Sequence, residues 1–177
     1  MTGTKDLRSW IKQAGEDLFS FAIDRGDVKT LVTHLTTKTS CKPATVEYEL
    51  QLLKIISTGW SISFFLGKSP LKDQLSEAYW KSIHGFAENL SETTELMTGH
   101  AIDYFQVARD RLDMYVSALT DKPEVLEPAA VIGPEFARQC GNGEDIFAVM
   151  AGSRMFIMTV ASVKGYLDPA SIGTAAH

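Results

Sequence analysis

The sequence predicts an all-α fold, a single bundle of about six or seven helices around two central apolar helices. Apolar residues recur at three- and four-residue spacing through nearly all of the 177 residues, as in helices that bury one side. No stretch alternates apolar and polar residues like a half-buried strand, and no internal repeat is evident. We place one domain at residues 1–168 and a weakly ordered tail at 169–177.

The first half of the chain predicts three helices. One runs from about residue 5 to 24, and a short one over 27–35 carries Val28, Leu31, Val32 and Leu35 on one stripe. After a polar connector, Pro43 suits the first turn of a long helix that ends near Leu66, before Gly67.

The second half predicts the remaining helices. Ser69 and Pro70 begin a helix that closes at Gly99, with a break near Asn89, because Asn89 and Glu92 have the spacing of a capping box. Another helix is expected over 100–120. The connector 121–143 is rich in Pro and Gly, and we expect either a functional loop there or one short helix over 134–139. The last helix spans 145–167.

The last helix is the most informative segment, because it is apolar on every side and carries Arg154 near its middle. Such a helix is expected to be covered on all sides by protein or lipid, and a buried arginine needs a partner. The helix at 43–66 places Glu49 on an apolar face, among Leu52, Leu53, Ile56 and Trp60. A Glu49–Arg154 ion pair is therefore the economical interpretation.

Composition favours a cytoplasmic protein without a cofactor. The net charge is −5 and no block of Lys and Arg occurs, which argues against nucleic-acid binding. The two cysteines stand apart, outside any metal-binding spacing. Residues 146–163 and 50–67 are apolar enough to test as membrane spans, but Arg154 and Lys54 interrupt them, so we expect no membrane association.

These features favour a non-catalytic helical module for binding or assembly, since no nucleophile or acid–base pair stands in a recognisable arrangement. Such a module has a filled core and an exposed apolar patch, through which it binds a partner protein or forms a homodimer. The expected members of that patch are Trp80, Val131, Ile132 and Phe136.

Two other classes of function remain open. A small-molecule site, enzymatic or not, would surround Arg154 in a closed pocket, with Trp60, Met150 and Met158 in its lining and Glu49 beside it or turned elsewhere. A helical chaperone or adaptor would hold a partner segment in a groove between helices.

Two weaker patterns favour plain structural interpretations. His84, Glu88, Glu92 and Glu95 recur at helical spacing, but they lie opposite the apolar stripe, so we expect a solvated face and no metal site. Cys140 precedes a helix N-terminus, a position that lowers a thiol pKa, yet a half-buried, unreactive cysteine is the favoured interpretation.

Overall fold

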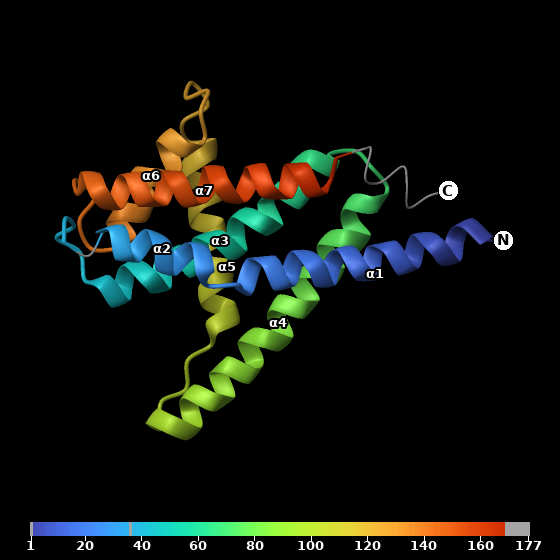
Figure 1. Ribbon diagram of the computed structural model, residues 1–177, viewed down its shortest axis with the longest axis horizontal. Helices are drawn as coiled ribbons and strands as arrows, with labels where there is room; N and C mark the ends of the chain where they lie inside the picture. The colour runs from blue at the N-terminus through green and yellow to red at the C-terminus, as the bar shows by residue number, and fades with distance from the viewer. Residues whose placement is uncertain (1, 36, 169–177) are drawn as a thin grey trace. The chain divides into compact units, whose positions relative to one another are not determined.

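The computed structural model describes residues 2–35 and 37–168, and within them the fold is all-α, as the periodicity predicts. Figure 1 shows the order of the seven helices in this part of the chain. They are α1 (Thr2–Ile23), α2 (Gly26–Leu35), α3 (Pro43–Leu66), α4 (Leu71–Thr98), α5 (Tyr104–Thr120), α6 (Ala129–Gln139) and α7 (Ile146–Tyr166). The tail expected at 169–177 lies outside the described residues.

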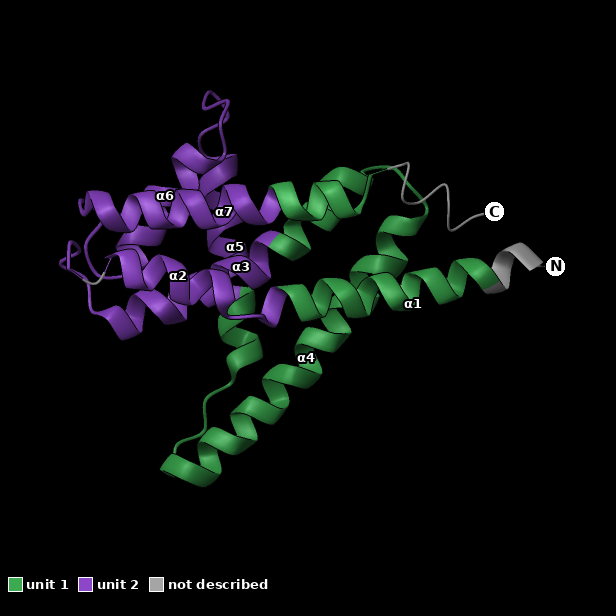
Figure 2. Ribbon diagram, in the orientation of Figure 1, with its two compact units in different colours: residues 1–21, 58–109, 161–177 green, residues 22–57, 110–160 purple. Residues whose placement is uncertain are grey.

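The chain divides into two compact units, which Figure 2 distinguishes by colour. Unit 1 comprises Met1–Phe21, Thr58–Arg109 and Ala161–His177, and unit 2 comprises Ala22–Ser57 and Asp110–Val160. In unit 1, α4 packs on α1, where an edge contact joins Phe19 and Phe86 with ring centroids 6.1 Å apart. The α2 and α6 helices belong wholly to unit 2.

Backbone geometry accounts for several helix ends. The α3 helix begins at Pro43 and ends before Gly67, whose φ of 45° is left-handed. Likewise, α4 ends before Gly99, whose φ is 73° and whose N–H donates to the Glu95 carbonyl. These are the ends that proline and glycine predict from the sequence.

Three boundaries differ from prediction. The α4 helix continues through Asn89 without a break, and the Asn89 carbonyl accepts a bond from Thr93 Oγ1 within the helix. The α5 helix begins at Tyr104, because Asp103 accepts the N–H of Gln106 and so caps the helix later than expected. The predicted short helix of the connector forms α6 and begins at Ala129, directly after Pro128.

The two apolar helices differ in burial. The middle of α3, including Leu50, Leu53 and Ile62, is buried as expected. Only 39% of the most apolar window of α7 is buried, so the expectation that protein covers this helix on every side is wrong. By length and composition α7 also qualifies as a membrane span, although core helices of water-soluble proteins pass the same test.

Polar side chains on the inner part of α3 hold the C-terminal end of α1. Gln51 Nε2 donates to the Ala22 carbonyl at 2.7 Å, and the fully buried Lys54 donates from Nζ to the Asp24 carbonyl at 3.0 Å. Lys54 also pairs with the Asp27 carboxylate at 3.2 Å. The last carbonyls of a helix have no partner within it, so these bonds fix where α1 stops in unit 2.

Asp145 connects the start of α7 to the segment before α3. One carboxylate oxygen accepts the N–H groups of Phe147 and Ala148, both at 3.0 Å, which makes Asp145 the N-cap of α7. The other oxygen accepts bonds from Thr39 and from the Ser40 amide and hydroxyl. Burial alone would raise the pKa of Asp145, but these hydrogen bonds hold it well below its usual range.

Two glycines let α6 and α7 approach closely. A Cβ at Gly152 would lie 2.6 Å from Cβ and Cγ of Phe136, and one at Gly133 would lie 2.7 Å from the Val149 carbonyl oxygen. Both separations are shorter than van der Waals contact allows. Unit 2 therefore depends on the absence of side chains at this crossing.

Candidate functional site

An apolar groove lies between α2 and α7 in unit 2, and we call it the α2–α7 groove. It has a volume of about 470 Å³. The C-terminal half of α2 forms one wall and the first half of α7 forms the other. The residues that line the groove are Leu31, His34, Leu35, Lys38, Phe147, Val149, Met150, Ala151, Ser153, Arg154 and Ile157.

One face of α7 borders this groove and stays exposed. Ile146 is 69% exposed, Met150 61% and Ile157 55%, and Phe147 and Met158 are exposed to a smaller extent. Helical spacing places all five, together with Arg154, on one side of α7. This stripe, Ile146, Phe147, Met150, Ile157 and Met158, is the exposed apolar face of α7.

Two cations border the α2–α7 groove. Lys38 Nζ lies 6.0 Å from the centroid of the Phe147 ring, within reach of a cation–π contact. The Arg154 side chain is exposed, and no hydrogen bond or ion pair engages its guanidinium among residues 2–35 and 37–168. Both charges can therefore meet a ligand or partner.

The expected Glu49–Arg154 ion pair does not form. Glu49 is buried as predicted, but its partner is Arg111 of α5, with Nη2 to Oε1 at 2.8 Å and Nε to Oε2 at 3.0 Å. This two-bond geometry satisfies both carboxylate oxygens, and it raises the pKa of Arg111. Glu49 is buried and pairs with a cation, but that cation is the partly exposed Arg111, so the assignment of Arg154 as its partner is wrong.

Arg111 is the residue that sequence reasoning missed. Helical spacing puts it on the same side of α5 as Ala108 and Tyr115, which are both buried. The position of Arg111 on the buried stripe of α5 is the sequence feature that could have identified it. The strongly apolar sequence of α7 makes Arg154 the more obvious candidate for a buried cation. The Glu49–Arg111 pair lies inside unit 2 and holds α3 to α5.

Two buried side chains near Glu49, the phenol of Tyr115 and the thiol of Cys140, have raised pKa values. Burial raises the pKa of Tyr115, as does the nearby Glu49 carboxylate, and the Tyr115 hydroxyl has no hydrogen-bond partner in the described part of the chain. Burial, and next the Cys41 thiol, raises the pKa of Cys140 to about 12. The expected effect of a helix N-terminus on Cys140 is thus outweighed by desolvation.

We expect the Cys140 thiol to resist alkylation in the folded protein. Thiolate is the reactive form, and an ordinary thiol with a pKa of 9.0 supplies far more of it at pH 8 than one with a pKa of about 12. Iodoacetamide should label Cys140 slowly in buffer and rapidly in urea, as followed by peptide mass spectrometry. Native labelling at the rate seen in urea would contradict the burial of this thiol.

The residues predicted to form an exposed patch do not form one. Val131, Ile132 and Phe136 are buried in unit 2, where Phe136 packs against Gly152. Trp80 is half-buried in unit 1 and its ring lies against Gly59, where a Cβ would come within 2.3 Å of it. The exposed apolar surface lies instead on α7.

The residues predicted to line a small-molecule site are not all brought together. Met150 and Arg154 line the α2–α7 groove, and Met158 lies on the same exposed face of α7. Glu49 is engaged by Arg111, and Trp60 belongs to unit 1, where its ring stacks on Phe64.

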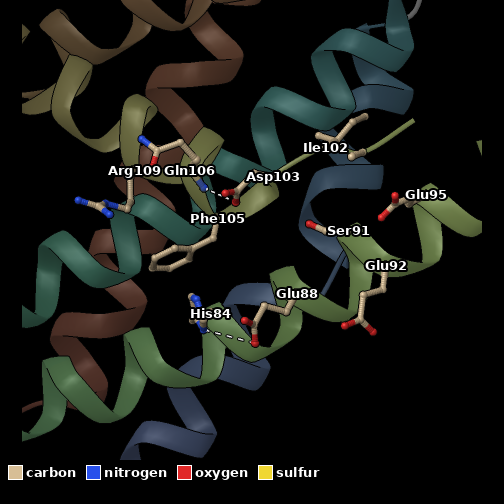
Figure 3. A pocket seen from close by; sticks show the side chains of 11 residues that line it. His84, Glu88, Ser91, Glu92, Glu95, Ile102, Asp103, Phe105, Gln106 and Arg109 are labelled. Carbon is tan, nitrogen blue, oxygen red and sulfur yellow. Dashed lines mark hydrogen bonds and ion pairs between the residues drawn. The ribbon is translucent and has the colours of Figure 1, made fainter. Parts of the chain in front are cut away.

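A second cavity of about 500 Å³ lies in unit 1 between α4 and α5. Figure 3 shows His84 and Glu88 facing each other there, with Nδ1 and Oε2 3.5 Å apart, and Asp103 bonded to Gln106. The His84 ring also makes an edge contact with the Phe105 ring, with the ring centroids 4.6 Å apart. Within the described residues, no group of three or more His, Cys, Asp or Glu side chains could hold a metal ion.

Comparison with known proteins gave no significant match to any family model, curated protein or solved structure.

Proposed function

We propose that the chain is a helical protein-binding module that holds an amphipathic helix of a partner protein in the α2–α7 groove. The exposed apolar face of α7 carries this proposal. Burying a large apolar side chain contributes about 1.5–3 kcal/mol, so leaving several of them on one helix face has a substantial cost. An exposed stripe of this kind on a helix is the usual mark of a contact surface.

The dimensions of the surface suit a helix. From Ile146 to Met158 the exposed face of α7 runs about 18 Å, which is about three turns of a partner helix. A groove between two helices accepts apolar side chains at positions i, i+3 or i+4, and i+7 of such a partner. The surface is open along α7, which favours a partner segment over an enclosed small molecule.

Association of two α7 faces in a homodimer is less favourable. A two-fold axis places the same surface patch on both copies. Pairing α7 with its own copy would bring two copies of Arg154 and Lys38 to one interface, and like charges there weaken binding. We therefore assign the groove to a different protein chain.

Ile157→Glu should weaken binding of an apolar helix without unfolding the module, because Ile157 is exposed. The probe is a labelled 18-residue helical peptide with leucines at i, i+3, i+4 and i+7 spacing, and fluorescence anisotropy measures its Kd. We expect Ile157→Glu to weaken binding by at least about tenfold, or 1.4 kcal/mol.

Ser162→Glu is the matched control, since it places the same charge at an exposed position of α7 outside the groove. It should leave the peptide Kd unchanged. Equal affinity of wild type and Ile157→Glu, or no peptide binding by wild type, would contradict the proposal. A dimeric wild type that becomes monomeric in Ile157→Glu, by light scattering, would show that a second copy occupies the groove instead.

A further inference from the structure

Among the described residues, the titratable side chains that line the α2–α7 groove are all basic. Lys38 and Arg154 line the groove, His34 adds a third basic side chain, and no acidic side chain is among the described residues that line it. The chain as a whole is acidic, with 22 Asp and Glu against 17 Lys and Arg. A cationic rim on an acidic protein is therefore a local feature that selects a ligand of opposite charge.

Lys38 and Arg154, the cations at the rim of the groove, are also available to bind a partner. Within the described residues, the Lys38 ammonium contacts the Phe147 ring and has no ion pair, and the Arg154 guanidinium has no ion pair either. The C-terminal end of α2 carries a partial negative charge close to His34, but that charge is too small to neutralise two full cations. Both cations thus remain to be satisfied by a partner.

The spacing of the cations sets the pattern of the partner. Lys38 lies over Phe147, and Phe147 and Arg154 are separated by two turns of α7, or about 10 Å. Carboxylates at positions i and i+7 of a helix lying along α7 would have the same separation and lie on one side of it. The apolar face of α7 between them would receive the leucine-like side chains of the partner.

We infer that the partner of the α2–α7 groove is an acidic amphipathic helix, with carboxylates about two turns apart that pair with Lys38 and Arg154. This inference rests on the proposed protein-binding function and adds the charge of the partner. The apolar face supplies affinity, and the two cations determine which helices bind and in which direction.

Three peptides with the same leucine stripe test this inference. They carry Glu, Gln or Lys at positions i and i+7 beside the stripe. In 50 mM NaCl we expect the Glu peptide to bind at least tenfold more tightly than the Gln peptide, and the Lys peptide to bind weakest. The ratio of the Gln-peptide Kd to the Glu-peptide Kd should shrink severalfold in 500 mM NaCl, because salt screens exposed charges.

Charge reversal of the groove gives the sharper result. In the Lys38→Glu/Arg154→Glu protein the preference should invert, so that the Lys peptide binds more tightly than the Glu peptide. Lys164→Glu, at an exposed lysine of α7 outside the groove, should leave the order of the three peptides unchanged.

The failures of the two proposals are distinguishable. If all three peptides bind equally and Ile157→Glu weakens their binding, the groove binds helices and the acidic partner is ruled out. If no peptide binds, both proposals fail. Vesicles of phosphatidylglycerol provide the remaining alternative. Vesicle binding that needs Lys38 and Arg154, without any peptide binding, would identify an anionic membrane surface as the ligand and overturn the inference.

Discussion

Gly152→Ala is expected to lower the free energy of unfolding by about 2 kcal/mol. A Cβ at this position would overlap Cβ and Cγ of Phe136, each 2.6 Å away, and Phe136 is fully buried and cannot swing aside. Alanine normally stabilises a helix relative to glycine, by up to about 1 kcal/mol, so a loss here must come from the clash between α6 and α7. Urea unfolding followed by circular dichroism measures the change.

Gly85→Ala is the matched control for this substitution. Gly85 lies in the interior of α4, and a Cβ there meets no neighbouring atom within 4 Å. Alanine should therefore stabilise the protein by up to about 1 kcal/mol. A loss of stability as large as that of Gly152→Ala would show that helix packing is not what distinguishes the two positions.

Arg111→Ala is expected to destabilise the protein by about 3 kcal/mol, because it leaves the Glu49 carboxylate buried without its cation. The Glu49 side chain is only 4% exposed, whereas that of Arg111 is 25% exposed, so the carboxylate bears most of this cost. For a chain of this length the melting temperature should fall by roughly 6–12 °C. Differential scanning calorimetry measures it directly.

Arg154→Ala provides the contrast, since the sequence alone pointed to this arginine as the buried partner. Arg154 is exposed and unpaired within the described residues, so its replacement should change stability by no more than about 0.5 kcal/mol. A large loss in Arg154→Ala with little change in Arg111→Ala would reverse the assignment of the Glu49 partner.

The sequence carries most of the information about helices, because their ends depend on local chemistry. Pro43, Gly67 and Gly99 define ends of α3 and α4 through their own φ preferences, and no distant residue is needed to predict them. The prediction of a break at Asn89 is wrong for a local reason too. A capping motif stabilises a helix start only where the helix is already interrupted, and α4 continues through Asn89.

The candidate site is less predictable, because it depends on which helix faces meet. The periodicity of α7 gives no preferred face, so nothing local distinguishes the buried Met155 from the exposed Met150 and Ile157. For the same reason the sequence predicts Phe136 on a contact surface, whereas the absence of a side chain at Gly152 leaves room for Phe136 in the core. Sequence spacing locates a charge on a helix but does not identify the helix opposite, which is why Glu49 was assigned the wrong arginine.

Each of the two units is built from segments that are far apart in the sequence, and this affects how the chain folds during translation. Each unit combines early and late segments, and α7 contributes to both, with residues up to Val160 in unit 2 and from Ala161 in unit 1. A ribosome adds about 5–20 residues per second, so the nascent chain waits on the order of ten seconds or more before α7 is available. During that interval Asp145 has not yet been made, and Thr39 and Ser40 lack the carboxylate that later holds them. Neither unit can therefore finish folding until α7 has been synthesised.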